Sequence, residues 1–296
     1  MKYLYRNLIN PMVHLSLLLS LFIASGALLQ AQSLLWKITP PGSKEVSWIY
    51  GTMHVKDDRV FHLPDGWDTK LKTAGRLVLE LNLAEVPDPM MVMTLMGTPE
   101  DSTLDKILTE SESKHLEQWV QDSLGLPWHL LKGLKPFFLM AMIQEKQMPS
   151  DREVALDQWL SNRASDWKLP VIGLETIEEQ LNALQHLPLS EQARMLMELI
   201  QPDQDIRHAL EAELMEAYLS GNLEHLYALS LRWETDPLFM REILLVRNYR
   251  MTERIKQLLA EKPAFIALGA LHLPGKEGIL ELLRGDGYLV ESEGMR

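Results

Sequence analysis

The sequence predicts an α/β (α+β) fold in which two similar halves form a mixed central sheet, with a large helical insertion between them. Each half reads as strand, Gly-x-x-His, helix and strand. The first half contains WIYGTMHV from Trp48, and the second contains FIALGALH from Phe265. From about residue 100 to residue 260 the chain carries mainly helical patterns. Paired units of this kind commonly pack as one layered domain. We therefore expect residues 32–296 to form a single domain with a pseudo-twofold axis between its halves.

The first half contains three expected strands. LLWKI and VSWIY flank the segment PPGSK, whose Pro, Gly and Ser supply turn geometry between two apolar runs. RLVLELNL, which begins at Arg76, is rich in leucine and valine and suits a buried strand. A short helical stretch around residues 67–73 precedes it. The pattern therefore predicts a strand pair, a helix and a third, buried strand.

The middle of the chain carries helix signals with one strand among them. Thr109 and Glu112 form a capping-box pattern, and Pro136 suits the first position of another helix. LPVIGLE, residues 169–175, reads as a strand and is followed at once by a second capping-box pattern. After further amphipathic helices, the chain closes with strand AFIAL, helix GILELLRG and strand YLVES.

The first 31 residues have the pattern of a secretory signal peptide. Lys2 and Arg6 precede a 15-residue apolar run, residues 15–29, and small residues follow it. Because a helix needs roughly 20 residues to cross a bilayer, we expect cleavage after residue 31 rather than a stable membrane span. The protein is therefore predicted to be periplasmic or secreted, and the mass of the mature N-terminal peptide tests this prediction.

The composition excludes several classes of function. The chain has 41 Asp and Glu against 29 Lys and Arg, a net charge of -12, whereas a nucleic-acid partner requires a basic surface. It has no cysteine, so disulfides, thiolate metal sites and cysteine nucleophiles are excluded. The sequence also lacks HExxH, a Gly-rich phosphate loop and G-x-S-x-G. The commoner zincins, nucleotide-binding proteins and serine hydrolases are therefore excluded.

The two Gly-x-x-His motifs are the main candidates for a site. Gly51 and Gly269 each end an apolar run, and His54 and His272 follow three residues later. A glycine at the end of a strand allows a sharp turn, and open α/β sheets keep their sites on the loops that follow such strand ends. A single motif of this kind is more often an ordinary loop histidine. Two motifs in matching contexts instead suggest two imidazoles that face one cleft.

Two carboxylates and one arginine are further candidates. Glu80 lies within the apolar run LVLELNL, and a buried carboxylate requires a cation, a metal or hydrogen-bond donors. The alternative for Glu80 is an outward-facing position on a half-exposed strand. Glu175 ends the strand PVIGLE, where it is either a site residue or a charge favoured by the dipole of the next helix. Arg247 interrupts an apolar helical stripe, so it forms either a structural ion pair or a contact with an anionic ligand.

The sequence resembles the TraB/GumN family, whose relatives include the Tiki metalloproteases. The resemblance extends in order over nearly the whole chain after residue 31. Its matching segments are YGTMHV, LVLEL with Glu80, LKPFF, LDQWL, GLETIEEQ, RNYRM and GALHLPG. Two positions depart from the family pattern, because Leu271 stands where a small residue is usual and Ala155 where Gly is usual.

The resemblance implies a metal-assisted hydrolase with the two histidines and the glutamate at its site. His54, Glu80 and His272 are then expected to hold a divalent metal ion. Their mixed nitrogen and oxygen ligands fit zinc, manganese or cobalt. Such an ion can lower the pKa of bound water from 15.7 to about 7. Glu175 is expected to act as a general base or to orient a ligand, and Arg247 to hold a carboxylate or meet developing negative charge.

Two classes of function remain open at this point. The first is an exported metal-dependent hydrolase, most simply a peptidase, acting on a peptide or related acyl bond. The second is an exported binding protein without catalysis that captures a peptide, a metal or a haem-like group in the same cleft. The sequence does not separate them, because an open coordination position serves binding and hydrolysis alike.

Overall fold

The structure is a computed structural model, and it describes residues 32–82, 84–85, 88–184, 187–201, 205–233 and 237–294. The predicted signal peptide, residues 1–31, lies outside the described residues. Within the described ranges, no helix combines the length and the apolar character that a bilayer crossing needs.

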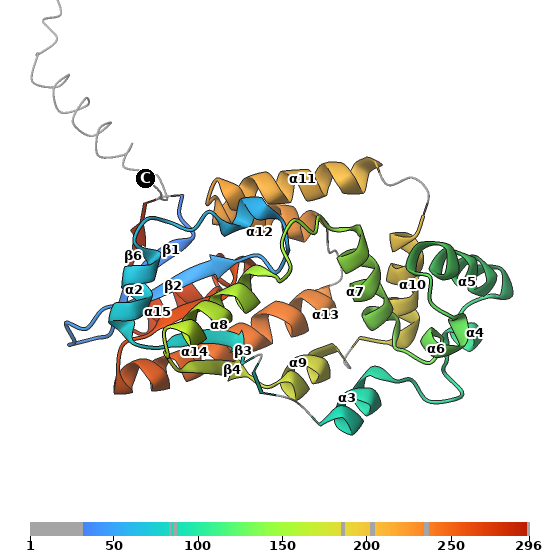
Figure 1. The fold of residues 1–296 in the computed structure, drawn as a ribbon, viewed down its shortest axis with the longest axis horizontal. Helices are drawn as coiled ribbons and strands as arrows, with labels where there is room; N and C mark the ends of the chain where they lie inside the picture. The colour runs from blue at the N-terminus through green and yellow to red at the C-terminus, as the bar shows by residue number, and fades with distance from the viewer. Residues whose placement is uncertain are drawn as a thin grey trace, which may run out of the picture. The chain divides into compact units, whose positions relative to one another are not determined.

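A six-stranded mixed sheet lies at the centre of the domain, in the order β4-β3-β5-β2-β1-β6 (Figure 1). The first four strands in that order are parallel to one another, whereas β1 is antiparallel to both β2 and β6. This arrangement confirms the predicted mixed α/β class. The strands are β1 (Leu35–Thr39), β2 (Ser47–Thr52), β3 (Leu77–Leu81), β4 (Val171–Glu175), β5 (Phe265–Gly269) and β6 (Leu289–Glu293).

The two Gly-x-x-His strands, β2 and β5, are direct neighbours at the centre of the sheet. Their register pairs Trp48 with Phe265 and Thr52 with Gly269, so both strands end at the same level. The chain continues from β2 through helix α2 to β3, and from β5 through helix α15 to β6. These two connections run in opposite directions along the sheet. The loops after β2 and β5 therefore meet where such sheets form their ligand-binding crevice.

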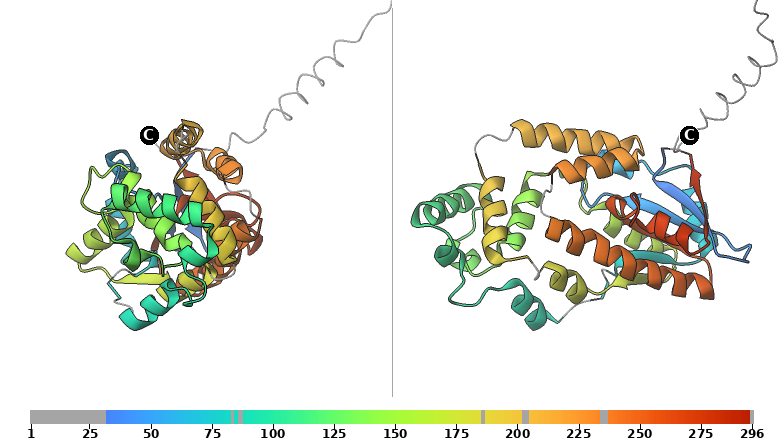
Figure 2. Two further views of the ribbon diagram at one scale, coloured as in Figure 1. Left: turned by 90° about the vertical axis from the view of Figure 1, so that its right-hand side faces the viewer. Right: turned by 180° about the vertical axis from the view of Figure 1, so that it is seen from behind.

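Helices cover both faces of the sheet (Figures 1 and 2). On one face α2 (Trp67–Ala74) packs against β2 and β5, and α8 (Leu156–Asp166) packs against β3 and β4. Trp67 of α2 contacts Trp159 of α8, with ring centroids 5.3 Å apart. The opposite face carries α14 (Val246–Glu261) and α15 (Ile279–Gly285), which contact each other. The sheet is therefore buried on both sides, which explains its continuous apolar strand sequences.

The insertion between the two halves is largely helical, as expected, and has a hydrophobic core of its own. Leu116, Val120, Leu139, Ile143 and Leu196 are buried together in this second core, separately from the core around the sheet. The remaining helices are α3 (Pro89–Met96), α4 (Leu104–Ile107), α5 (Glu110–Leu124), α6 (Trp128–Leu131), α7 (Pro136–Gln147), α9 (Ile177–Ala183), α10 (Leu189–Leu199), α11 (Asp205–Leu219), α12 (Leu223–Trp233) and α13 (Pro237–Met240). Short 3-10 segments are η1 (Asp58–Phe61) and η4 (Ala270–His272), and η3 (Arg241–Leu245) is a π-helical segment between α13 and α14.

The helix-start signals in the sequence are confirmed. Thr109 caps α5 and Thr176 caps α9, each with the reciprocal bonds of a capping box. Pro136 occupies the first turn of α7, where the missing N–H of proline costs nothing. The capping box at Thr176 begins α9 directly after β4, at the carboxyl end of the strands where the candidate residues lie.

Candidate functional site

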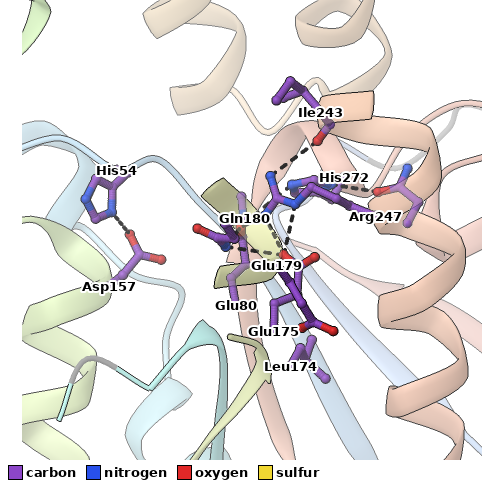
Figure 3. A network of polar contacts seen from close by, with 12 residues as sticks. His54, Glu80, Asp157, Leu174, Glu175, Glu179, Gln180, Ile243, Arg247 and His272 are labelled. Carbon is purple, nitrogen blue, oxygen red and sulfur yellow. Dashed lines mark hydrogen bonds and ion pairs between the residues drawn. The ribbon is translucent and has the colours of Figure 1, made fainter. Parts of the chain in front are cut away.

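The candidate residues gather at the carboxyl ends of four neighbouring parallel strands. Glu80 lies on β3, Glu175 ends β4, His272 lies in η4 directly after β5, and His54 follows β2 by two residues. In the view of Figure 3, His54 lies on one side of Glu80, and Arg247 and His272 lie on the other. The sheet therefore brings side chains from distant parts of the chain together at the carboxyl ends of its parallel strands.

Glu80 is held by donors on both of its carboxylate oxygens. The Gly269 N–H donates to Oε1 at 2.7 Å, and Arg247 Nη2 donates to Oε2 at 2.5 Å. Burial works against the charge, whereas His272 in its protonated form, the Arg247 guanidinium and the Gly269 N–H favour it, and their combined effect lowers the pKa of Glu80. Glu80 is therefore an ionised carboxylate at the sheet edge, and the outward-facing alternative does not describe it.

The glycines of the two motifs lie where the packing is tight, and neither uses a left-handed backbone. A Cβ on Gly269 would lie 3.0 Å from Glu80 Oε1, and a Cβ on Gly51 would lie 3.0 Å from Leu273 and 3.1 Å from the Ala270 side chain. The expected role of glycine in a sharp turn is thus replaced by a steric one. At Gly269 the missing side chain allows the Glu80 carboxylate to reach a backbone N–H.

Arg247 joins the two carboxylates. Its Nε and Nη2 donate to Glu175 Oε2 at 2.9 and 2.7 Å, and Nη2 also reaches Glu80. The Glu175 side chain is completely buried, and its other oxygen accepts a hydrogen bond from Arg250. Of the two alternatives for Arg247, the structure shows the ion pair that ties α14 to the sheet. Both oxygens of Glu175 are engaged by arginines, so its geometry suits orienting Arg247 better than accepting a proton from water.

A third ion pair extends this row of charges away from the site. Arg254, which lies two turns after Arg247 on α14, donates to Glu179 at 2.7 and 2.6 Å and to the Leu174 carbonyl. The hydrogen bonds from Arg254 are the main reason why the pKa of Glu179 falls to about 2. Three arginines on one face of α14 thus match three glutamates from β3, β4 and α9.

The lowered pKa of Glu179 predicts a specific acid dependence of stability. A carboxyl whose pKa is lower in the folded than in the unfolded state stabilises the fold above its ordinary pKa of 4.5. That contribution is lost progressively as the pH falls from 4.5 to about 2. We expect Glu179→Gln to reduce the slope of unfolding free energy against pH in this window. Urea denaturation at several pH values measures the slope, and an unchanged slope would contradict the assignment.

His272 is held in one tautomer by an asparagine. Its Nδ1 lies 2.6 Å from Asn248 Oδ1, and Asn248 Nδ2 donates to the backbone carbonyl of Glu277 at 2.8 Å. Because that carbonyl can only accept, the amide must present its oxygen to the histidine. Nδ1 therefore carries the proton, and the lone pair lies on Nε2, 3.8 Å from Glu80 Oε1. Burial lowers the pKa of His272 and so favours the neutral ring, the form that binds metals.

His54 has a corresponding partner, but its surroundings differ. Its Nδ1 lies 3.0 Å from Asp157 Oδ2, and Thr52 donates to the other Asp157 oxygen at 2.7 Å. The hydrogen bond to Asp157 is the main cause that raises the pKa of His54. The side chain is 73% exposed and lines a cavity of about 360 Å³ with Lys56 and Glu145 among its walls.

The structure thus brings two of the three predicted metal ligands together and leaves the third apart. Glu80 and His272 face each other, whereas His54 lines the neighbouring cavity. In the described part of the chain, no group of three or more His, Asp or Glu side chains is close enough to hold a metal ion. Asp157 and Asn248 were not assigned roles from the sequence. Helical spacing alone gave no sign that either faces a histidine from another segment.

Comparison with known proteins places the chain in a family. The model of the TraB/PrgY/gumN family matches residues 34–292, nearly all of the described domain. The chain belongs to this family. The family match confirms the resemblance noted in the sequence and covers every residue of the candidate site.

Among curated proteins, this family member is similar to the "Metalloprotease TIKI2" of Danio rerio, with 24% identity over 316 residues, and to the "Metalloprotease TIKI1" of Homo sapiens, with 25% over 322 residues. Both matches cover 88% of this chain but only 60% and 62% of those relatives. The "Uncharacterized protein YbaP" of Shigella flexneri is 23% identical over 251 residues, which cover 83% of this chain and 90% of that protein. No solved structure matches the chain. Two of these relatives are named metalloproteases, at 24% and 25% identity to this chain.

Proposed function

We propose that the protein is an exported metal-dependent hydrolase that cleaves a peptide or related acyl bond. One observation supports this most directly: after neighbouring strands of the sheet, two histidines each have Nδ1 hydrogen-bonded to a side-chain oxygen, and one of them faces an ionised glutamate. Metal-binding histidines typically have such an outer partner, because it fixes the tautomer and orients the ring. The named metalloprotease relatives agree with this chemistry.

The donors present suit a divalent ion in their chemistry. His272 offers an unprotonated Nε2, Glu80 a charged oxygen, and His54 is the third proposed ligand, with its Nδ1 directed at Asp157. Neutral imidazole and carboxylate ligands fit zinc, manganese or cobalt. A bound ion of this kind supplies an acidic water at neutral pH.

The protein's own groups would orient and charge the site. Arg247 keeps Glu80 ionised and fixes its carboxylate, and Glu175 in turn fixes Arg247. The Gly269 N–H holds the second oxygen of Glu80 in place. Asp157 would hold the His54 ring through Nδ1 and leave Nε2 as the donor atom.

Metal analysis of the purified protein together with a chelator-sensitive cleavage assay tests the proposal. We expect bound metal and cleavage of a peptide library that a chelator abolishes and one added ion restores. His54→Ala and His272→Ala should lose both properties, because each removes a neutral nitrogen ligand. His225→Ala, at an exposed position on α12, is the matched control and should retain them.

Two outcomes would contradict the proposal in different ways. Unchanged metal content and activity in both histidine variants would remove the assigned ligands. Bound metal without turnover of any peptide or ester would favour the alternative, an exported binding protein that captures a peptide, a metal or a haem-like group in this cleft.

A further inference from the structure

A second cavity adjoins the one that contains His54, and its walls are almost entirely apolar. It has a volume of about 330 Å³, and Gln144 and Ser230 are the polar residues among those that line it. Ala141 and Gln144 of α7 line both cavities. The two cavities therefore lie next to each other along α7. Its apolar walls include Phe137, Met140, Met195, Leu214, Ile243 and Leu271.

The wall of this cavity is connected directly to the candidate site. Leu271 immediately precedes His272 in η4. Ile243 and Leu244 belong to the π-helical segment η3, and the Ile243 carbonyl accepts a hydrogen bond from Arg247 Nη1 at 3.2 Å. Single π-helical turns are rare and frequently occur at functional sites. A ligand in the apolar cavity would therefore lie against the segments that position His272 and Arg247.

The two cavities offer different chemistry to a ligand that spans them. Among the described residues that line the apolar cavity none is charged, so a charged group placed there would lose its water without compensation from them. Three of its walls are methionines, whose flexible side chains adapt to differently shaped apolar groups. The His54 cavity instead carries Lys56 and Glu145, paired at 2.9 Å, and can meet polar groups. A polypeptide combines these features, because its backbone is polar and its side chains can be apolar.

We propose that the apolar cavity binds one large apolar side chain of a peptide, next to the bond that the site acts on, and that Leu271 and Ala141 form part of its wall. The assignment of the cleaved bond rests on the proposed function, whereas peptide binding in the cavity does not. The volume lies at the lower end of the range for ligand pockets. It is large enough for any one apolar side chain, Leu, Met, Phe or Trp.

A binding experiment with metal-free full-length protein separates this inference from catalysis. The probes are end-blocked Gly-Gly-Xaa-Gly-Gly peptides with Xaa as Leu, Phe, Trp, Ser or Asp, titrated by NMR. We expect the Leu and Phe peptides to bind at least about tenfold more tightly than the Ser peptide, since burying such a side chain in an apolar site is favourable. The Asp peptide should bind more weakly still.

Two variants of lining residues test the location. Leu271→Ala should enlarge the cavity and shift the preference from Leu toward Trp. Ala141→Trp should fill the junction and reduce the difference between Leu and Ser to less than about threefold, because Ala141 is exposed and a larger side chain fits there without disturbing the core. Leu130→Ala, at a 62% exposed position on α6, is the matched control and should bind like wild type.

Several outcomes would overturn the inference. Equal binding of the Leu and Ser peptides by wild type would remove the apolar subsite, and wild-type specificity in a folded Leu271→Ala variant would remove its proposed wall. If wild type binds decanoate more tightly than every peptide and the Ala141→Trp variant does not bind it, the cavity holds an acyl chain instead. Peptide selectivity without metal-dependent turnover would contradict the proposed function and leave this inference standing.

Discussion

Replacement of Arg247 by Met is expected to lower the free energy of unfolding by about 3–5 kcal/mol, the usual cost of removing one partner from a buried ion pair. Arg247 neutralises Glu175, whose side chain is completely buried, and it also holds Glu80. Met retains much of the apolar volume of the arginine side chain, so the cost arises mainly from the two oxygens, Oε2 of Glu175 and Oε2 of Glu80, that lose the guanidinium. Urea denaturation at pH 7 measures the change.

Arg254→Met on the same helix is the matched control. Its side chain is 36% exposed and that of its partner Glu179 is 27% exposed, so water compensates for much of the lost pair, and we expect a cost of about 1 kcal/mol. Adding Glu175→Gln to Arg247→Met should restore part of the stability, because it removes a buried charge. Equal losses in Arg247→Met and Arg254→Met would show that burial does not decide the cost.

Much of the fold follows from local sequence signals. The apolar runs became strands, and the capping boxes at Thr109 and Thr176 begin helices where expected. The pattern of alternating apolar runs does not contain the strand order, however. The pairing of β1 between β2 and β6, and of β4 beside β3, depends on contacts between distant segments. Such nonlocal choices leave no periodic trace in the sequence.

The candidate site shows the same division. Glu80 and the Gly-x-x-His residues were predictable because a charge in an apolar run and a repeated motif are both local signals. Asn248 was not, because its role depends on the Glu277 carbonyl that fixes its amide and on a histidine 24 residues away. Asp157 faces His54 across 103 residues. Both partners became apparent only when the fold placed α8 beside the loop after β2 and α14 beside η4.

The outer partners make the two histidines chemically different. His272 is buried beside a neutral amide, and burial lowers its pKa. His54 is exposed beside a carboxylate that raises its pKa. One imidazole is thus kept as a neutral nitrogen donor, while the other retains access to protons and solvent. In the proposed hydrolase both rings would bind the ion in the neutral form, so protons would compete with the ion more strongly at His54 than at His272.

Replacement of Glu80 by Gln is expected to reduce turnover on the order of a thousandfold in the proposed hydrolase. Gln has nearly the same shape and can still accept the Gly269 N–H bond, so the loop after β5 should keep its position. It lacks the negative charge that a divalent ion requires from its oxygen ligand. Several kcal/mol of metal-derived transition-state stabilisation would be lost, and about 4 kcal/mol corresponds to a thousandfold in rate. Metal content and initial rates measured on the same preparation test this expectation.

Graded effects at two neighbouring positions make the Glu80 result specific. Asn248→Leu removes the partner of His272 but no ligand, so metal affinity should fall about 10- to 100-fold, as is usual for outer partners. Gln180→Met removes only long hydrogen bonds to Glu80 and Glu175, of 3.4 and 3.2 Å, and should change affinity by less than about threefold. If Glu80→Gln retains its metal while Asn248→Leu loses it, His272 binds the ion without Glu80. The main role of the Glu80 carboxylate would then be its ion pair with Arg247, and not metal binding.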